Sequence, residues 1–113
     1  MDTSGGISDD FMKEMLRKTR RYTLVVLHAT PKRHGPGADA IVWEHGRRNF
    51  ELRRDGLLRI VCPVVEKGSI AGICIFASDL DETRRVMDGD PAVEAGILTY
   101  ETHSIAGFPK DSL

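Results

Sequence analysis

Residues 57–77 read LLRIVCPVVEKGSIAGICIFA, and this stretch decides the fold that the sequence predicts. Two apolar runs, 57–65 and 70–77, are joined by a short polar connection that contains Gly68. This pattern is typical of an antiparallel hairpin. Pro63 lacks the amide proton that an interior strand needs, so the first strand of the hairpin is expected at a sheet edge or at a bulge.

The hairpin is flanked on each side by one strand pattern and one helix pattern. Before it, residues 22–30 are apolar and β-branched, and residues 38–55 are long enough for a helix that Gly56 would end. After it, the spacing of a capping box predicts a helix from Ser78, Pro91 breaks helical geometry at Asp90, and residues 97–103 form a last strand. The order β-α-β-β-α-β predicts an α+β, ferredoxin-like split β-α-β fold with an antiparallel four-stranded sheet.

The segments before the first strand form a separate part of the predicted organisation. Residues 1–8 are glycine-rich and lack periodicity, so they are expected to be a flexible lead-in. Residues 9–21 place apolar side chains on one stripe, with acids first and bases last, which predicts an extra N-terminal helix. Trp43 and Phe50, on the side of the long helix away from His45, are expected to pack under it. Residues 22–113 would be the ferredoxin-like domain.

Composition limits the function classes. The 113 residues are 41% hydrophobic and 29% charged with a net charge of -1, which predicts one soluble domain without a general attraction for nucleic acid or anionic membranes. No apolar run approaches the roughly 20 residues of a membrane span. Two cysteines cannot build a disulfide framework, so a cytoplasmic location is expected.

Motifs of nucleotide, hydrolase and metalloprotease sites are absent from the sequence, and its four histidines are spread over separate elements. We therefore expect neither a cofactor nor a bound metal. The predicted helices cover only one face of the sheet. Because its other face carries apolar residues, a homodimer through the sheet faces is expected.

Two residues stand out as candidates for chemistry. His45 shares the helical stripe of Ile41 and Leu52, which should face the sheet, where an imidazole is either a hydrogen-bonded core residue or poised in a cleft. Asp90 precedes Pro91, which is also ordinary turn chemistry. Neither residue decides the function by itself.

Several segments resemble one known family. They are HGRRNFELRRDGLL from His45, GICIFAS from Gly72, DLDETRRVM from Asp79, and GDPAVEAGILTYETH from Gly89. Together they are similar to the YciI-like (YCII-related) family of small dimeric α/β barrel proteins, over about residues 22–108. Many members carry an arginine three residues before the helix histidine, where this chain has Val42.

The resemblance implies a sheet-to-sheet dimer with a His-Asp dyad, His45 and Asp90, at a cleft. Such a pair is suited to general acid–base chemistry, which predicts a cofactor-independent isomerase or lyase acting on a small organic molecule. The alternative is a non-catalytic dimeric module that binds a small molecule or a protein. His28, on the strand face of Leu24 and Val26, would either line the same pocket as a binding residue or cap the end of its strand.

Overall fold

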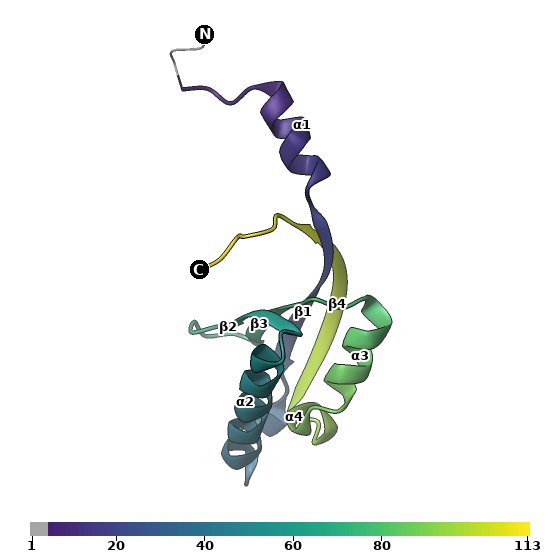
Figure 1. The fold of residues 1–113 in the computed structure, drawn as a ribbon. Coiled ribbons are helices and arrows are strands. Elements are labelled where there is room, and N and C mark those ends of the chain that lie inside the picture. The colour runs from purple at the N-terminus through teal and green to yellow at the C-terminus, as the bar shows by residue number, and fades with distance from the viewer. Residues whose placement is uncertain (1–4) are drawn as a thin grey trace.

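The computed structural model describes residues 5–113, and the fold it shows is the predicted α+β, ferredoxin-like arrangement (Figure 1). Half of the lead-in predicted for residues 1–8 lies outside the described residues. The elements in chain order are α1 (Asp9–Arg17), β1 (Arg20–Ala29), a 3-10 turn η1 (Pro31–His34), α2 (Ala38–Arg54), β2 (Leu58–Pro63), β3 (Ile70–Phe76), α3 (Leu80–Asp88), α4 (Pro91–Glu94) and β4 (Leu98–Gly107).

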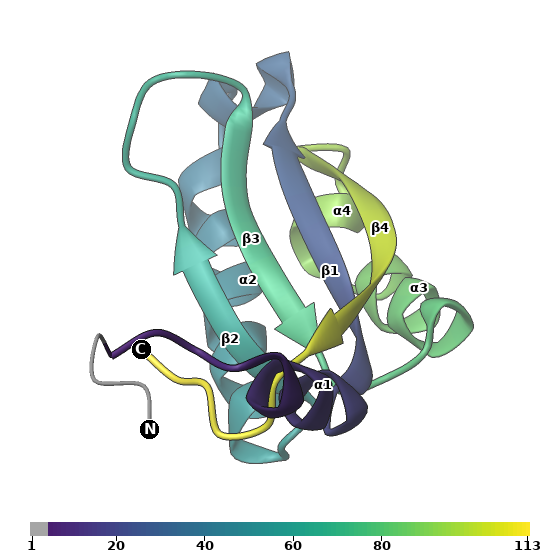
Figure 2. The same ribbon diagram turned by 90° about the horizontal axis from the view of Figure 1, so that it is seen from above.

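The four strands form one antiparallel sheet in the order β2-β3-β1-β4. β2 lies at an edge, which is one of the two positions that Pro63 predicts, and β1 lies between β3 and β4. Helices α2, α3 and α4 all lie on one side of the sheet, so the other side is open in the single chain (Figure 2).

The core fills the space between the sheet and these helices. Alternate residues of β1, namely Thr23, Val25 and Leu27, point to that side and are buried together with Phe76 and Cys74 of β3. Burial raises the pKa of the Cys74 thiol to about 12, so this cysteine is an inert core residue.

The open face carries the other half of each strand. Directly opposed residues in antiparallel strands share a face, so the register shows which half-exposed and exposed side chains lie on this surface. They are Tyr22, Leu24, Val26, His28, Ile60, Cys62, Ile73, Ile75, Thr99, Glu101, His103 and Ile105. The centre of this face is apolar, and Cys62 lies on the side of the sheet opposite Cys74, so the two free cysteines do not face each other.

Several element boundaries differ from the sequence prediction. The N-terminal helix ends at Arg17 rather than residue 21, because β1 already pairs with β4 from Arg20 onward. The cap of α3 is Asp79 rather than Ser78, since its carboxylate accepts the Glu82 backbone N–H at 2.8 Å. Ser78 instead bonds to the Thr83 hydroxyl, 2.7 Å away.

The expected packing of Trp43 and Phe50 under the N-terminal helix is wrong. Trp43 is 71% exposed and Phe50 is 66% exposed, and α1 has no buried residue. Figure 1 shows the reason: α1 projects from the open side of the sheet, away from α2. Within residues 5–113, no helix combines the length and apolar character needed to cross a bilayer.

Candidate functional site

His45 and Asp90 meet in the structure. His45 Nδ1 lies 2.7 Å from Asp90 Oδ1, although the two residues are 45 positions apart in the sequence. The Asp90 side chain is 1% exposed and that of His45 is 12% exposed. The pair therefore joins α2 to the start of α4 and touches the surface only at the imidazole.

The local sequence fixes the position of Asp90. Pro91 occupies the first turn of α4 and Asp90 is its N-cap, with an extended backbone. Asp90 Oδ2 accepts the backbone N–H groups of Ala92 at 3.0 Å and Val93 at 3.2 Å. This capping holds the carboxylate so that its other oxygen, Oδ1, faces His45.

The second ring nitrogen of His45 faces an amide. Asn49, one turn further along α2, places Nδ2 3.3 Å from His45 Nε2. A carboxylate only accepts hydrogen bonds, so His45 Nδ1–H donates to Asp90, and in the neutral ring Nε2 carries the lone pair that accepts from Asn49. The sequence analysis missed Asn49, which the spacing of four residues on one helix face would have revealed.

Arg48 brings a cation to the pair and was also missed. Its Nη2 donates to the Val86 carbonyl at 2.7 Å, and its Nη1 lies 3.8 Å from Asp90 Oδ1. Nη1 is buried without a hydrogen-bond partner. Gly89 makes room for this guanidinium, because a Cβ there would lie 3.2 Å from Nη2. The chain thus has a cation, Arg48, beside the pair.

The surroundings of Asp90 keep it ionised. Burial by itself raises the pKa of this carboxyl, but the hydrogen bond and charge of His45 and the backbone N–H groups of Val93 and Ala92 lower it. The net result is a pKa below its ordinary value of 3.8. The carboxylate is therefore charged throughout the physiological pH range.

This lowered pKa predicts a loss of stability in acid. A carboxyl whose pKa is lower in the folded than in the unfolded state stabilises the fold above its ordinary pKa, and the contribution disappears as the pH falls through the folded value. We expect urea midpoints of the wild type to fall below about pH 4. The Asp90→Asn variant, which cannot titrate here, should show a shallower fall. If the urea midpoint fell equally steeply with pH in both proteins, the result would contradict a lowered pKa of Asp90 as the cause of the loss.

His28 does not lie beside His45 and Asp90. It lies on the open face of the sheet, whereas His45 is on the helical side, so the two do not line one pocket. His28 Nε2 lies 2.8 Å from Glu101 Oε1, and His103 Nε2 lies 2.6 Å from Glu101 Oε2. Hydrogen bonds from both imidazoles lower the pKa of Glu101. Within residues 5–113, no three or more histidine, cysteine, aspartate or glutamate side chains are arranged so that they could hold a metal ion.

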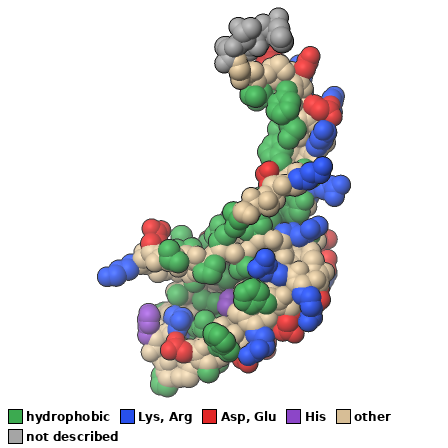
Figure 3. Space-filling view, turned by 60° about the vertical axis from the view of Figure 1, so that its left-hand side comes forward, with side chains coloured by type: hydrophobic (Ala, Val, Ile, Leu, Met, Phe, Trp, Pro, Cys, Tyr) green, Lys and Arg blue, Asp and Glu red, His purple; other side chains and the backbone are tan. Residues whose placement is uncertain are grey.

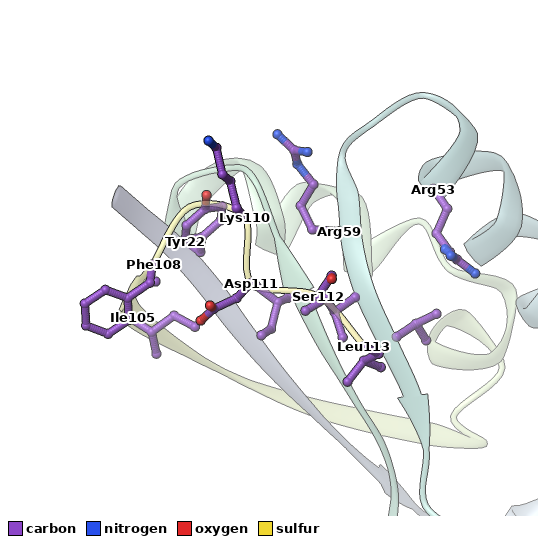
Figure 4. Close-up of a pocket in the computed structure, with 13 residues that line it drawn as sticks. Tyr22, Arg53, Arg59, Ile105, Phe108, Lys110, Asp111, Ser112 and Leu113 are labelled. Carbon is purple, nitrogen blue, oxygen red and sulfur yellow. The ribbon is translucent and has the colours of Figure 1, made fainter. Parts of the chain in front are cut away.

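Among the surface hollows formed by residues 5–113 are three that neither His45 nor Asp90 lines. One, of about 590 Å³, lies between the open face and the C-terminal segment, with Tyr22, Ile105 and Phe108 in its wall (Figure 4). Another, of about 490 Å³, lies on the outer side of α2 between Trp43 and Phe50. None of these three hollows opens onto His45, whose side chain is 12% exposed.

Comparisons with known proteins bear on the fold. No protein-family model matches the chain, and no curated protein matches it in sequence. Among solved structures, it is similar to 5-chloro-2-hydroxyhydroquinone dehydrochlorinase (TftG) from Burkholderia phenoliruptrix AC1100, in complex with 2,5-dihydroxybenzoquinone. The TM-score is 0.51 at 15% identity, over 80% of this chain and 95% of the other. The two chains share a fold.

Proposed function

We propose that the chain is a YciI-like, cofactor-independent enzyme that moves a proton on a small organic molecule. His45 is the general base or acid, and Asp90 is its orienting partner. The observation that carries the proposal is the 2.7 Å contact between His45 Nδ1 and a carboxylate that is 1% exposed. It holds the imidazole in the tautomer whose Nε2 can accept a proton.

The chemistry needs only this pair. His45 Nε2 takes a proton from a carbon or hydroxyl of the substrate, and the electron pair left behind forms a double bond as a leaving group departs from the neighbouring atom. In an isomerisation, the same proton returns to another atom of the conjugated system. The Asp90 carboxylate stabilises the imidazolium that forms in either case. Asn49 must turn aside or move with the ring for Nε2 to reach substrate.

The neighbour of known structure supports this reaction class. It is named a dehydrochlorinase and holds 2,5-dihydroxybenzoquinone. Loss of hydrogen chloride is an elimination, which a single well-placed base can promote without a metal or a covalent intermediate. We therefore assign hydroxylated, unsaturated ring compounds as the first substrate class to try.

The test is an elimination that depends on the imidazole. The wild-type protein is incubated with 5-chloro-2-hydroxyhydroquinone, and chloride release is followed above the uncatalysed rate. The same assay is repeated with His45→Gln. Release that is equal in both proteins would contradict the proposed role of His45.

A non-catalytic module is the second candidate. It is favoured by the burial of the pair and by the absence of His45 from the hollows described above, since a buried hydrogen bond that ties α2 to α4 also has a purely structural use. In that case His45→Gln lowers the free energy of unfolding by about 1–3 kcal/mol. The wild type would then have no catalytic activity that depends on His45.

The proposal includes a homodimer through the open sheet faces in a reducing cytoplasm, with a small molecule rather than nucleic acid as ligand. The apolar centre of the open face supports the dimer, because a bare surface of this kind is costly in water. The free Cys62 and Cys74, on opposite sides of the sheet, fit a reducing compartment.

Dimerisation can be tested by light scattering at micromolar concentration. The wild type is expected to be a dimer, and Ile73→Lys, which places a charge on the open face, should shift it to monomer. Val65→Lys is the matched control, since Val65 lies outside the strands and is 98% exposed. A wild type that is monomeric throughout would contradict the sheet-to-sheet dimer.

A further inference from the structure

Helix α1 has no partner within the described chain. Ser8 caps it by accepting the Phe11 N–H, and acids at its start and Arg17 at its end suit the helix dipole. Yet Phe11, Met12 and Leu16, on one stripe, are each more than half exposed. A nine-residue helix is only marginally stable in water unless its apolar side packs against something. This helix therefore needs a surface that the single chain does not supply.

The shape of the chain points the same way. A compact domain of this length has a radius of gyration of about 13 Å. The value here is 17.5 Å, and the longest dimension is 64 Å. Figure 1 shows that α1 rises from the open side of the sheet as an arm, which lengthens the molecule in that direction.

The apolar side of the arm is continuous with the open face. In the space-filling view, hydrophobic side chains run along the concave side of the molecule from α1 down to the sheet (Figure 3). Tyr22, near the start of the strand that follows the arm, pairs with Ile105, and both line the hollow beside the C-terminal segment together with Phe108 (Figure 4). Arm and sheet thus form one concave apolar surface.

This geometry selects a second copy of the chain as the occupant. Two sheets packed face to face lie about 10 Å apart. Nine helical residues span about 14 Å, so an arm that rises from the open side extends past the layer of a facing sheet. Any copy seated on the open face therefore lies beside α1, and by two-fold symmetry its own arm lies beside the first chain.

We propose that α1 is a clasp: in the dimer, the apolar stripe of each α1 packs against the flank of the other copy. The inference rests on the proposed sheet-to-sheet dimer and adds a second contact to it. Because α1 contributes nothing to the core of its own chain, its substitutions act on association and leave the fold unchanged.

The experiment measures the dimer dissociation constant of the full chain by sedimentation. The double variant Phe11→Glu with Leu16→Glu places a charge at two positions of the apolar stripe and leaves Met12 in place. Lys13→Glu, on the polar side of the same helix, changes the net charge by the same amount and is the control. We expect the double variant to raise Kd about tenfold or more, and the control to leave it within about twofold. Amide exchange of residues 9–17 should also slow as the wild type is concentrated above its Kd.

The outcomes separate the two proposals. A dimer whose Kd is unchanged in the double variant overturns the clasp and leaves the sheet contact standing. Equal effects of the double variant and the control also overturn it, since charge alone would then explain the change. A wild type that does not associate at all overturns both the clasp and the dimer. None of these results bears on the chemistry of His45, which is judged by turnover.

Discussion

Replacing His45 with glutamine is expected to lower kcat for proton transfer by about 10²- to 10⁴-fold. The glutamine amide can still donate to Asp90 Oδ1, so the link between α2 and α4 is retained in part. It has no nitrogen that accepts a proton near neutral pH. The variant therefore separates the base from the structural tie, and kcat and KM on the substrate identified by chloride release are the measurements.

Asp90→Asn is expected to lower the same rate for a different reason. Its amide oxygen can continue to accept from Ala92 and Val93, while its NH2 group donates to His45 Nδ1. The imidazole proton then moves to Nε2, and the atom that should accept a proton is blocked. A folded Asp90→Asn protein with an unchanged rate would contradict the tautomer argument.

The control for both variants is His34→Gln. His34 is exposed in η1, so this substitution changes a histidine without touching the pair. Its rate should match that of the wild type. If His34→Gln and His45→Gln lose activity equally, the loss does not come from the dyad.

Asp90→Ala is expected to lower the free energy of unfolding by about 3–5 kcal/mol. The substitution removes the cap of α4, leaves the His45 Nδ1–H and two backbone N–H groups without their acceptor, and removes the negative charge nearest to Arg48. These groups are buried or nearly so, and water replaces the carboxylate poorly. The loss is a large part of the 5–15 kcal/mol that usually separates folded from unfolded chains.

Urea unfolding at neutral pH measures this cost. Asp90→Asn should lose clearly less than Asp90→Ala, because it keeps an acceptor for the cap. Asp88→Ala is a suitable comparison, because it removes an exposed carboxylate of the same region, which accepts a hydrogen bond from the Tyr100 hydroxyl at 2.6 Å. If Asp88→Ala and Asp90→Ala lowered the free energy of unfolding by similar amounts, the buried hydrogen bonds of Asp90 would not be what stabilises the junction of α2 and α4.

Local chemistry was readable from single stretches of the chain. The hairpin follows from two apolar runs around Gly68, and Gly56 has the positive φ, 81°, that its position as a helix end predicts. Pro91 stops the preceding helix and makes Asp90 a cap. These features depend on residues that are neighbours in the sequence, so the sequence pattern predicts them.

Contacts between distant elements were harder to anticipate. Arg48 was missed because nothing in its spacing says which side of α2 meets α4, whereas the four-residue spacing between His45 and Asn49 was a local signal. Trp43 and Phe50 were assigned to the wrong neighbour, since amphipathicity identifies an apolar stripe but not the surface that covers it. The meeting of His45 with Asp90 came from the family resemblance, and residue spacing alone would not have placed it.

The sequence by itself determined the order of helices and strands, limited β2 to an edge or a bulge, and placed a helix break before Pro91, because turn residues and periodicity act over a few positions. Only the tertiary structure decided that His45 and Asp90 touch, that His28 lies on the opposite side of the sheet, and that α1 stands free of its own domain. Those outcomes depend on how whole elements pack, where burial and close contact between remote side chains outweigh any local preference.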